Sequence, residues 1–214
     1  MSVSPDLVVV DYGMGNRRSV EKALERAGAR VAVTADHAAI RAADGVVVPG
    51  VGAFPRAMEN LRRLGLDDLL RERAAAGVPL LGICLGMQLL FDSSVELGGA
   101  EGLGLIPGTV EVLDTAGARL PHIGWNLVRF ERAARLIAGL PGEAAFYHVH
   151  SYAPACADAS HVLGTAEYGT RFTTAVARDN VAVVQFHPEK SSTHGLRLLG
   201  GFVGECAAAE AAAA

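Results

Sequence analysis

The stretch that decides the fold is PLLGICLGMQLL, residues 79–90. An apolar run stops at Cys84, glycines stand two residues before and two residues after it, and an apolar helical pattern follows. Where a strand turns sharply into a helix, the residue at the turn has strained backbone angles and an exposed side chain, and only small residues fit on either side. The stretch therefore predicts a nucleophile elbow that presents the Cys84 thiol at the carboxyl edge of a sheet.

The local environment of such an elbow favours a reactive cysteine. A helix N-terminus carries a partial positive charge, which stabilises a thiolate. The plainer alternative is a buried core cysteine. Glycine is unfavourable inside an ordinary strand or helix, so Gly82 and Gly86 favour the elbow.

A histidine that could serve Cys84 as a base lies far downstream, in VAVVQFHPEKS, residues 181–191. The apolar run reads as a central strand that ends at His187. Pro188 keeps His187 extended, and residues two apart in an extended chain point the same way, so His187 and Glu189 can share one face. A His-Pro-Glu string alone is more often a solvated loop. Paired with the elbow, it predicts a Cys84–His187–Glu189 triad.

Length and composition indicate one folded domain with a sizeable core. The chain has 214 residues, of which 50% are hydrophobic, and its mean hydropathy is +0.28. A formal charge of −4 gives no basic field for a nucleic-acid backbone, so no nucleic-acid partner is expected. We expect one domain over residues 1–206. The low-complexity, Ala-rich tail 207–214 is expected to extend a last helix that begins near His194.

Cysteine usage and the N-terminus indicate a cytoplasmic protein. The three cysteines, Cys84, Cys156 and Cys206, have no metal-like spacing, and no signal segment or membrane-length apolar run is present in the sequence. We therefore expect no disulfide, no metal, no cofactor and no membrane contact.

The order of elements predicts the fold class. The first half alternates strand and helix patterns, namely Leu7–Asp11, Ser19–Ala27, Arg30–Thr34, His37–Ala43, Gly45–Pro49, Pro55–Leu64 and Leu66–Ala76. The second half is mostly strands, expected over Thr109–Leu113, Phe146–Tyr152, His161–Tyr168, Phe172–Arg178 and Val181–His187. This order predicts an α/β fold of three layers, flavodoxin-like and doubly wound, with a mostly parallel sheet that antiparallel strands extend.

Two turns follow strands on the predicted functional edge. DYGMGN, residues 11–16, lacks the third glycine of a dinucleotide-binding loop. It is either a strand-to-helix loop with Asn16 or Ser19 as N-cap, or a docking loop. PGVG, residues 49–52, lies on the same sheet edge as the elbow, where Gly50 and Gly52 let backbone N–H groups approach a reacting atom, so it is predicted to be an oxyanion strand.

The sequence resembles the class I, triad-type glutamine amidotransferases over nearly its whole length. Within them it is similar to the glutaminase subunits of imidazole glycerol phosphate synthase. The strings that carry the resemblance are GICLGMQ, QFHPEKS, DYGMGN, PGVGAF, EGLGLIPGTV, PHIGWN and VHSY. The chain departs from the family pattern at Arg17, where an apolar residue is common, and at His148, where an aromatic is usual.

The resemblance implies a division of labour between two chains. Cys84 is the expected nucleophile, His187 the general base and acid, and Glu189 the group that orients His187. Ammonia released from glutamine is expected to pass to a cyclase partner with a (β/α)₈ barrel. That partner makes imidazole glycerol phosphate and an aminoimidazole carboxamide ribotide in histidine biosynthesis.

Thiolate attack on the glutamine carboxamide creates an oxyanion that backbone N–H groups could hold. The donors expected are Leu85 and, once the Gly50–Val51 peptide has reoriented, Val51. By resemblance, the amino-acid end of glutamine is held by Gln88 and Glu96, with backbone around Gly52, Ser151 and Tyr152. The alternatives are that Gln88 caps the elbow helix and that Glu96 is a solvated loop carboxylate.

The resemblance also places a partner-facing surface. His122 and Trp125, both in PHIGWN, are expected at the interface, because tryptophan buries much area there. Asn16 belongs to the docking-loop alternative, and Lys190 is expected to pair with the cyclase or to be an ordinary exposed lysine. Four other histidines, His37, His148, His161 and His194, are expected to be satisfied core or surface residues.

Two competing functions stay open on the sequence. One is a glutaminase serving another synthase, of the anthranilate or guanylate type, in which PGVG and PHIGWN would be unexpected. The other is a non-catalytic binding protein that kept the elbow for structural reasons; the intact Cys84, His187 and Glu189 count against it.

Overall fold

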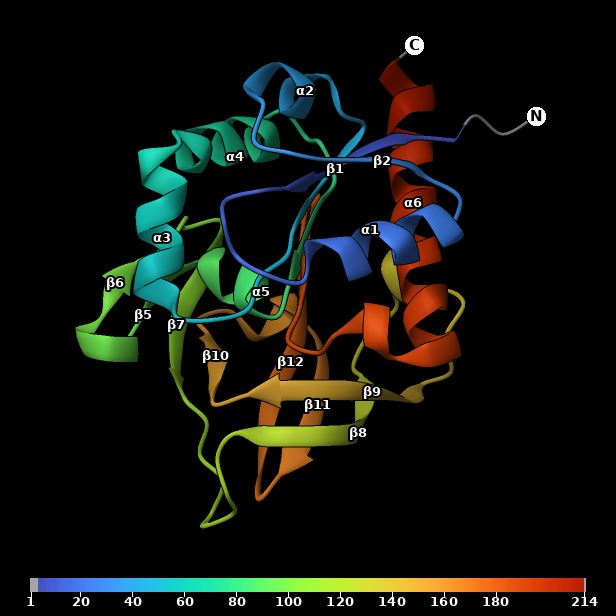
Figure 1. Ribbon diagram of the computed structural model, residues 1–214. Coiled ribbons are helices and arrows are strands. Elements are labelled where there is room, and N and C mark those ends of the chain that lie inside the picture. Colours follow the sequence, from blue (N-terminus) through green and yellow to red (C-terminus); the bar gives the residue numbers. More distant parts are fainter. Residues whose placement is uncertain (1–3, 214) are drawn as a thin grey trace.

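The computed structural model describes residues 4–213, in which two sheets are packed with helices (Figure 1). The nine-stranded sheet of these residues has the order β2-β1-β3-β4-β13-β12-β11-β8-β9. Its strands are β1 (Asp6–Val10), β2 (Arg30–Thr34), β3 (Gly45–Val48), β4 (Leu80–Ile83), β8 (His122–Phe130), β9 (Glu143–His150), β11 (Val162–Tyr168), β12 (Thr170–Arg178) and β13 (Val181–Val184). A four-stranded sheet in the order β10-β7-β5-β6 lies beside it, formed by β5 (Phe91–Ser94), β6 (Ala100–Glu101), β7 (Ile106–Val112) and β10 (Tyr152–Cys156).

Helices cover both faces of the parallel half of the large sheet (Figure 1). They are α1 (Arg17–Arg26), α2 (His37–Ala42), α3 (Phe54–Arg63), α4 (Leu66–Ala75), α5 (Leu85–Leu89) and α6 (Ser192–Ala213). Because strand side chains alternate, Leu7 and Val9 of β1 pack in the core with α1 and α6, whereas Val8 and Val10 pack in the core with α2 to α5. Short 3₁₀ turns span Glu96–Gly98, Arg135–Ile137, Ala159–His161 and Pro188–Lys190.

The predicted fold class is confirmed. Strands β2, β1, β3, β4 and β13 pair in parallel, and β12, β11, β8 and β9 extend the sheet in antiparallel fashion. The completely buried segments GVVV in β3 and LLGI in β4 are the apolar runs that a parallel sheet covered on both faces requires. Alternating strand and helix patterns were therefore sufficient to predict this half of the fold.

Two expected strands are wrong in detail, and three strands were missed. The strand predicted over Val181–His187 ends at Val184, and a 3₁₀ turn follows His187. The strand predicted over Phe146–Tyr152 is two strands, since β9 ends at His150 and β10 begins at Tyr152 in the other sheet. The missed strands are β5, β6 and β8.

The parallel order brings the functional segments to one edge. The turns after β1, β3, β4 and β13 carry residues 11–16, residues 49–52, Cys84 and His187, because parallel strands place their carboxyl ends on the same side. At the C-terminus, the Ala-rich segment continues helix α6 to Ala213. The last residue of that tail, Ala214, lies outside the described residues. No helix within residues 4–213 combines the length and apolar character needed to cross a membrane.

Candidate active site

Cys84 occupies the strained turn that the sequence predicted. Its backbone angles are φ 55° and ψ −110°, between the end of β4 and the start of α5. A Cβ at Gly86 would lie 1.7 Å from the Val48 carbonyl oxygen, and one at Gly82 would lie 2.8 Å from the Gly86 carbonyl oxygen. Both glycines are therefore required for α5 to pack so closely on β3 and β4, and this packing fixes the direction of the thiol.

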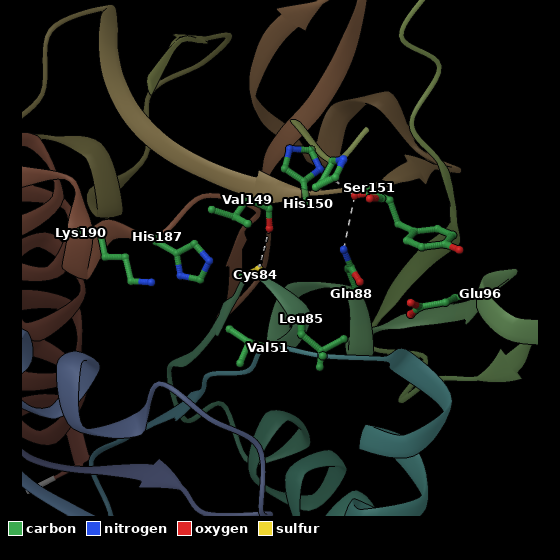
Figure 2. Close-up of a pocket in the computed structure, with 13 residues that line it drawn as sticks. Val51, Cys84, Leu85, Gln88, Glu96, Val149, His150, Ser151, His187 and Lys190 are labelled. Carbon is green, nitrogen blue, oxygen red and sulfur yellow. Dashed lines mark hydrogen bonds between the residues drawn. The ribbon is translucent and has the colours of Figure 1, made fainter. Parts of the chain in front are cut away.

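His187 and Glu189 form a buried pair beside this cysteine. His187 Nδ1 lies 2.8 Å from Glu189 Oε1, and their side chains are 2% and 0% exposed. Since the carboxylate accepts, Nδ1 carries the hydrogen and Nε2 is left to exchange a proton with Cys84, toward which the ring is turned (Figure 2). Burial alone would lower the pKa of His187, but hydrogen bonds and charge interactions with Cys84 and Glu189 raise it to about 9.

The backbone of residues 187–191 holds this pair rigidly. The 3₁₀ turn Pro188–Lys190 brings Glu189 back toward the imidazole, as the spacing of two residues predicted. The His187 N–H donates to the Tyr147 carbonyl at 2.9 Å, and Ser191 Oγ donates to the His187 carbonyl at 2.6 Å. The main chain of the histidine is thus tied to β9 and to the start of α6.

Asn16 supplies a contact that sequence reasoning missed. Its backbone stands at the N-cap position of α1 with φ 73°, but its side chain does not cap the helix. Instead Nδ2 donates to Glu189 Oε1 at 2.6 Å, across a sequence separation of 173 residues. Glu189 Oε2 is buried without a protein partner among the described residues. The loop after β1 therefore helps to fix the carboxylate that orients His187.

The turn formed by residues 49–52 faces the elbow. The Leu85 N–H donates to the Gly50 carbonyl oxygen at 3.3 Å. The turn therefore directs the Gly50 carbonyl, and not the Val51 N–H, toward the elbow. Tyr12 donates its buried hydroxyl to the Pro49 carbonyl at 2.5 Å, and a Cβ at Gly50 would lie 2.3 Å from that hydroxyl oxygen. Gly52 has φ +115°, a conformation that side chains rarely adopt.

A cavity of about 310 Å³ opens in front of Cys84 (Figure 2). Its lining includes every residue expected to hold the amino-acid end of glutamine, namely Gly52, Gln88, Glu96, Ser151 and Tyr152. Gln88 does not cap the elbow helix; its Nε2 donates to the Gln185 side-chain oxygen at 3.0 Å and to the Tyr152 carbonyl at 3.4 Å. Glu96 is not a free loop carboxylate either, because Oε2 accepts from the Phe54 N–H at 2.7 Å, where α3 begins.

The residues expected at a partner surface separate into two groups. Trp125 is 56% exposed on the outer face of β8, and Lys190 is exposed at the rim of the cavity. The expectation for His122 is wrong, because its side chain is only 3% exposed and stacks on Tyr168 with a centroid separation of 4.1 Å. Alternation along β8 turns His122 inward and Trp125 outward.

His148 and the two other cysteines take no part in the triad. His148 is completely buried and bonded at both nitrogens, to the Phe146 carbonyl at 3.1 Å and to the Thr174 hydroxyl at 2.8 Å. Cys156 and Cys206 are free thiols, and burial raises the pKa of Cys156 to about 11. Within residues 4–213 no three His, Cys, Asp or Glu side chains gather as metal ligands.

Comparison with known proteins places this geometry in a family. Residues 8–204 match the model of "Glutamine amidotransferase class-I". The chain is 53% identical to "Imidazole glycerol phosphate synthase subunit HisH" of Moorella thermoacetica, over 92% of this chain and 93% of that protein. It is 49% identical to the protein of the same name from Herpetosiphon aurantiacus, again over 92% of this chain and 93% of that one.

Solved structures agree at the level of the fold. A structure of a glutamine amidotransferase superposes with a TM-score of 0.70 at 23% identity, covering 93% of this chain and 98% of that one. PurLQS from Thermotoga maritima superposes with a TM-score of 0.71 at 17% identity, covering 94% and 99%. On the family match and the identity to these relatives, the chain belongs to the class I glutamine amidotransferases.

Proposed function

We propose that this chain is the glutaminase subunit of an imidazole glycerol phosphate synthase. It hydrolyses glutamine to glutamate and ammonia, and a (β/α)₈-barrel cyclase subunit uses the ammonia to make imidazole glycerol phosphate and an aminoimidazole carboxamide ribotide in histidine biosynthesis. The observation that carries the proposal is the buried His187–Glu189 pair, 2.8 Å apart, beside an elbow cysteine that lines the cavity. The name carried by the HisH relatives, up to 53% identical, supports the choice of synthase.

The reaction is acyl transfer through the thiol. Cys84 gives its proton to His187 Nε2, and its sulfur attacks the side-chain carboxamide of glutamine. The tetrahedral intermediate collapses as the same imidazolium protonates the departing nitrogen, which leaves as ammonia. A water molecule, deprotonated by His187, then cleaves the thioester to glutamate and regenerates the thiol. The raised pKa of His187, about 9, matches a group that must hold a proton between these steps.

The amino-acid end of glutamine fits the polar end of the cavity. Glu96 can accept from the substrate ammonium group, and the Ser151–Tyr152 backbone with Gln88 lines the wall opposite the turn. These side chains are already fixed by hydrogen bonds to other parts of the chain. Fixed partners lower the entropic cost of binding, because the pocket does not have to be ordered by the substrate.

A surface suited to the cyclase lies next to this cavity. Ile123, Trp125 and Leu127 project from the outer face of β8 and are 59%, 56% and 59% exposed. Val51 of the turn is 39% exposed, and Lys190 is exposed at the cavity rim. An apolar stripe with an aromatic anchor is typical of a protein interface, and a cyclase docked on it would lie next to the cavity in which ammonia is released.

The direct test combines the purified chain with the cyclase subunit of an imidazole glycerol phosphate synthase. Glutamate and imidazole glycerol phosphate should form together in the presence of glutamine and the cyclase's nucleotide substrate. In parallel mixtures with the synthase subunits of anthranilate synthase and GMP synthase, glutamine should not support product formation. Product with either of those partners but not with the cyclase would overturn the assignment, and no glutamine turnover in any mixture would favour a non-catalytic protein.

A further inference from the structure

Three histidines of strands β8 and β9 lie in the core beside the active site. His122, His148 and His150 are 3%, 0% and 5% exposed, and their rings pack on each other with centroid separations of 5.0 to 5.6 Å. The triad chemistry uses none of them. Buried imidazoles keep such positions only when their nitrogens are paired, so each hydrogen bond can be assigned.

The bonds of His122 and His150 run in one direction. His150 Nδ1 lies 2.9 Å from the Tyr152 carbonyl, which can only accept, so this nitrogen carries the hydrogen. The neutral ring must then accept at Nε2, where His122 Nδ1 approaches to 3.1 Å and donates. His122 accepts in turn at Nε2 from Asn126 Nδ2 at 3.4 Å. Asn126 Nδ2 also donates to the Glu167 carbonyl at 2.8 Å, which fixes the orientation of the amide.

This series of bonds, from Asn126 through His122 and His150 to the Tyr152 carbonyl, is called the histidine relay below. It requires both imidazoles to be neutral. Burial lowers the pKa of His122, and burial together with the neighbouring His122 and His187 lowers the pKa of His150 to about 4. Both rings can therefore serve as acceptors at neutral pH.

The relay continues into the active site. The Tyr152 carbonyl that accepts from His150 also accepts from Gln88 Nε2 at 3.4 Å. Gln88 Nε2 donates to Gln185 Oε1 at 3.0 Å, and Gln185 Nε2 lies 3.8 Å from the Cys84 sulfur. The relay ends on the Tyr152 carbonyl. His150, Ser151 and Tyr152 all line the cavity in front of Cys84, and Figure 2 shows His150 beside Ser151.

The far end of the relay lies on the strand that carries the exposed apolar stripe. His122 and Asn126 point to the inner face of β8, whereas Ile123, Trp125 and Leu127 point outward. A shift of β8 on docking would move the donors of the relay as well, because both faces belong to one backbone. The geometry points to His122 and His150 as positioning residues that hold the Ser151–Tyr152 wall for glutamine and connect it to β8. This inference rests on the proposed function and adds to it how the glutamine site is coupled to the partner.

Two substitutions of His150 test the roles of its two ring nitrogens separately. Asparagine places an N–H where Nδ1 lies, so His150→Asn can keep the bond to the Tyr152 carbonyl. Glutamine places its amide where Nε2 lies, so His150→Gln keeps a partner for His122 but loses the bond to Tyr152. Both are neutral, polar and smaller than histidine, which makes them a matched pair.

The experiment measures steady-state glutaminase kinetics of each variant in the complex with the cyclase. His150→Gln should raise KM for glutamine about five- to tenfold with kcat nearly unchanged, the size of one net hydrogen bond. His150→Asn should keep KM within about twofold of the wild type, because it keeps the direct bond to the Tyr152 carbonyl and loses only the bond from His122, which acts on the wall indirectly. His122→Phe, which keeps the stacking on Tyr168, should raise KM by a smaller factor, and adding it to His150→Gln should raise KM no further.

Controls distinguish this inference from the function on which it rests. Synthesis from ammonium salts should stay at the wild-type rate in all variants, since it does not use the glutamine pocket. If the wild-type complex does not hydrolyse glutamine, the proposed function fails. If the wild type does and His150→Gln keeps the wild-type KM, or if His150→Asn raises KM as much as His150→Gln, the relay does not position the wall and the inference is overturned.

Discussion

The Leu85 N–H donates to the Gly50 carbonyl oxygen at 3.3 Å, and this contact occupies a donor that an oxyanion above Cys84 would need. A tetrahedral intermediate is stabilised by N–H groups already directed at its oxygen. With the Gly50 carbonyl in that place, the turn of residues 49–52 is in a resting arrangement. Rotation of the Gly50–Val51 peptide would release the Leu85 donor and turn the Val51 N–H inward.

We therefore expect the isolated chain to be a poor glutaminase that the cyclase switches on. Loss of one oxyanion donor costs about 10²- to 10³-fold in rate, so the gain on docking should be at least of that size. The cyclase must bind the active turn more tightly than the resting one for this to happen. Steady-state assays of the chain alone, with cyclase, and with cyclase plus nucleotide measure the gain. Full turnover by the lone chain would mean that the turn is already competent.

Close packing at the elbow predicts an unequal response to two glycine substitutions. Gly86→Ala places a Cβ 1.7 Å from the Val48 carbonyl oxygen, so it should destabilise the fold by several kcal/mol or prevent folding. Gly204→Ala, in helix α6, has nothing within 4 Å of the new Cβ and should be neutral or stabilise by ~0.5–1 kcal/mol. Urea denaturation of both variants tests the expectation. Equal stability of the two would show that α5 can move off β3 without cost.

The contacts of Glu189 predict a graded loss of activity. Glu189→Gln keeps an oxygen that can accept from His187 Nδ1 and Asn16 Nδ2, but it cannot stabilise the imidazolium by charge. Its turnover should fall, yet remain above that of His187→Ala, since triad hydrolases lose on the order of 10⁴-fold with the orienting carboxylate and about 10⁶-fold with the base. Single-turnover glutaminase rates in the complex provide the comparison. A Glu189→Gln variant as inactive as His187→Ala would show that the carboxylate has another role.

The buried histidines predict a loss of stability in acid. The pKa of His122 is lowered, that of His148 is well below 6.5, and that of His150 is lowered to about 4, in each case mainly by burial. Since the unfolded chain binds these protons near pH 6.5, stability that is present above pH 6.5 is lost as the pH falls toward 4. His150 alone accounts for roughly 3 kcal/mol of this change.

The measurement is urea denaturation at intervals from pH 7 to pH 4, on the wild type and on His148→Phe. The variant removes one of the three titrating groups, so its free energy of unfolding should fall less steeply over this range. An unchanged slope would indicate that His148 is protonated in the folded protein.

Sequence patterns were sufficient where local chemistry decides the structure. Glycines two residues on either side of Cys84 predicted the strained turn, and the observed φ of 55° is that turn. Apolar runs such as GVVV predicted the parallel half, because a strand covered on both faces must be apolar throughout. The His187 and Glu189 spacing predicted which side chains meet, although the strand ends at Val184, three residues earlier than expected.

Sequence patterns were insufficient where long-range packing decides. In β8 the polar His122 points into the core and the apolar Trp125 points to the solvent, which is the reverse of an ordinary surface strand. The apolar residues of β8 therefore did not indicate its buried face. The contact of Asn16 with Glu189 joins residues that no local pattern connects. The hydrogen bond from the Phe54 N–H to Glu96 likewise joins residues that are 42 positions apart in the sequence.

The central claim is that Cys84 releases ammonia which a separate chain consumes. The most direct test is the Cys84→Ala variant in the reconstituted complex, with imidazole glycerol phosphate formation measured from glutamine and, separately, from ammonium salts. Glutamine-dependent synthesis should fall to background while ammonium-dependent synthesis stays at the wild-type rate, because the thiol is needed only to break the carboxamide bond. Loss of both activities, or retention of the glutamine-dependent one, would contradict the account.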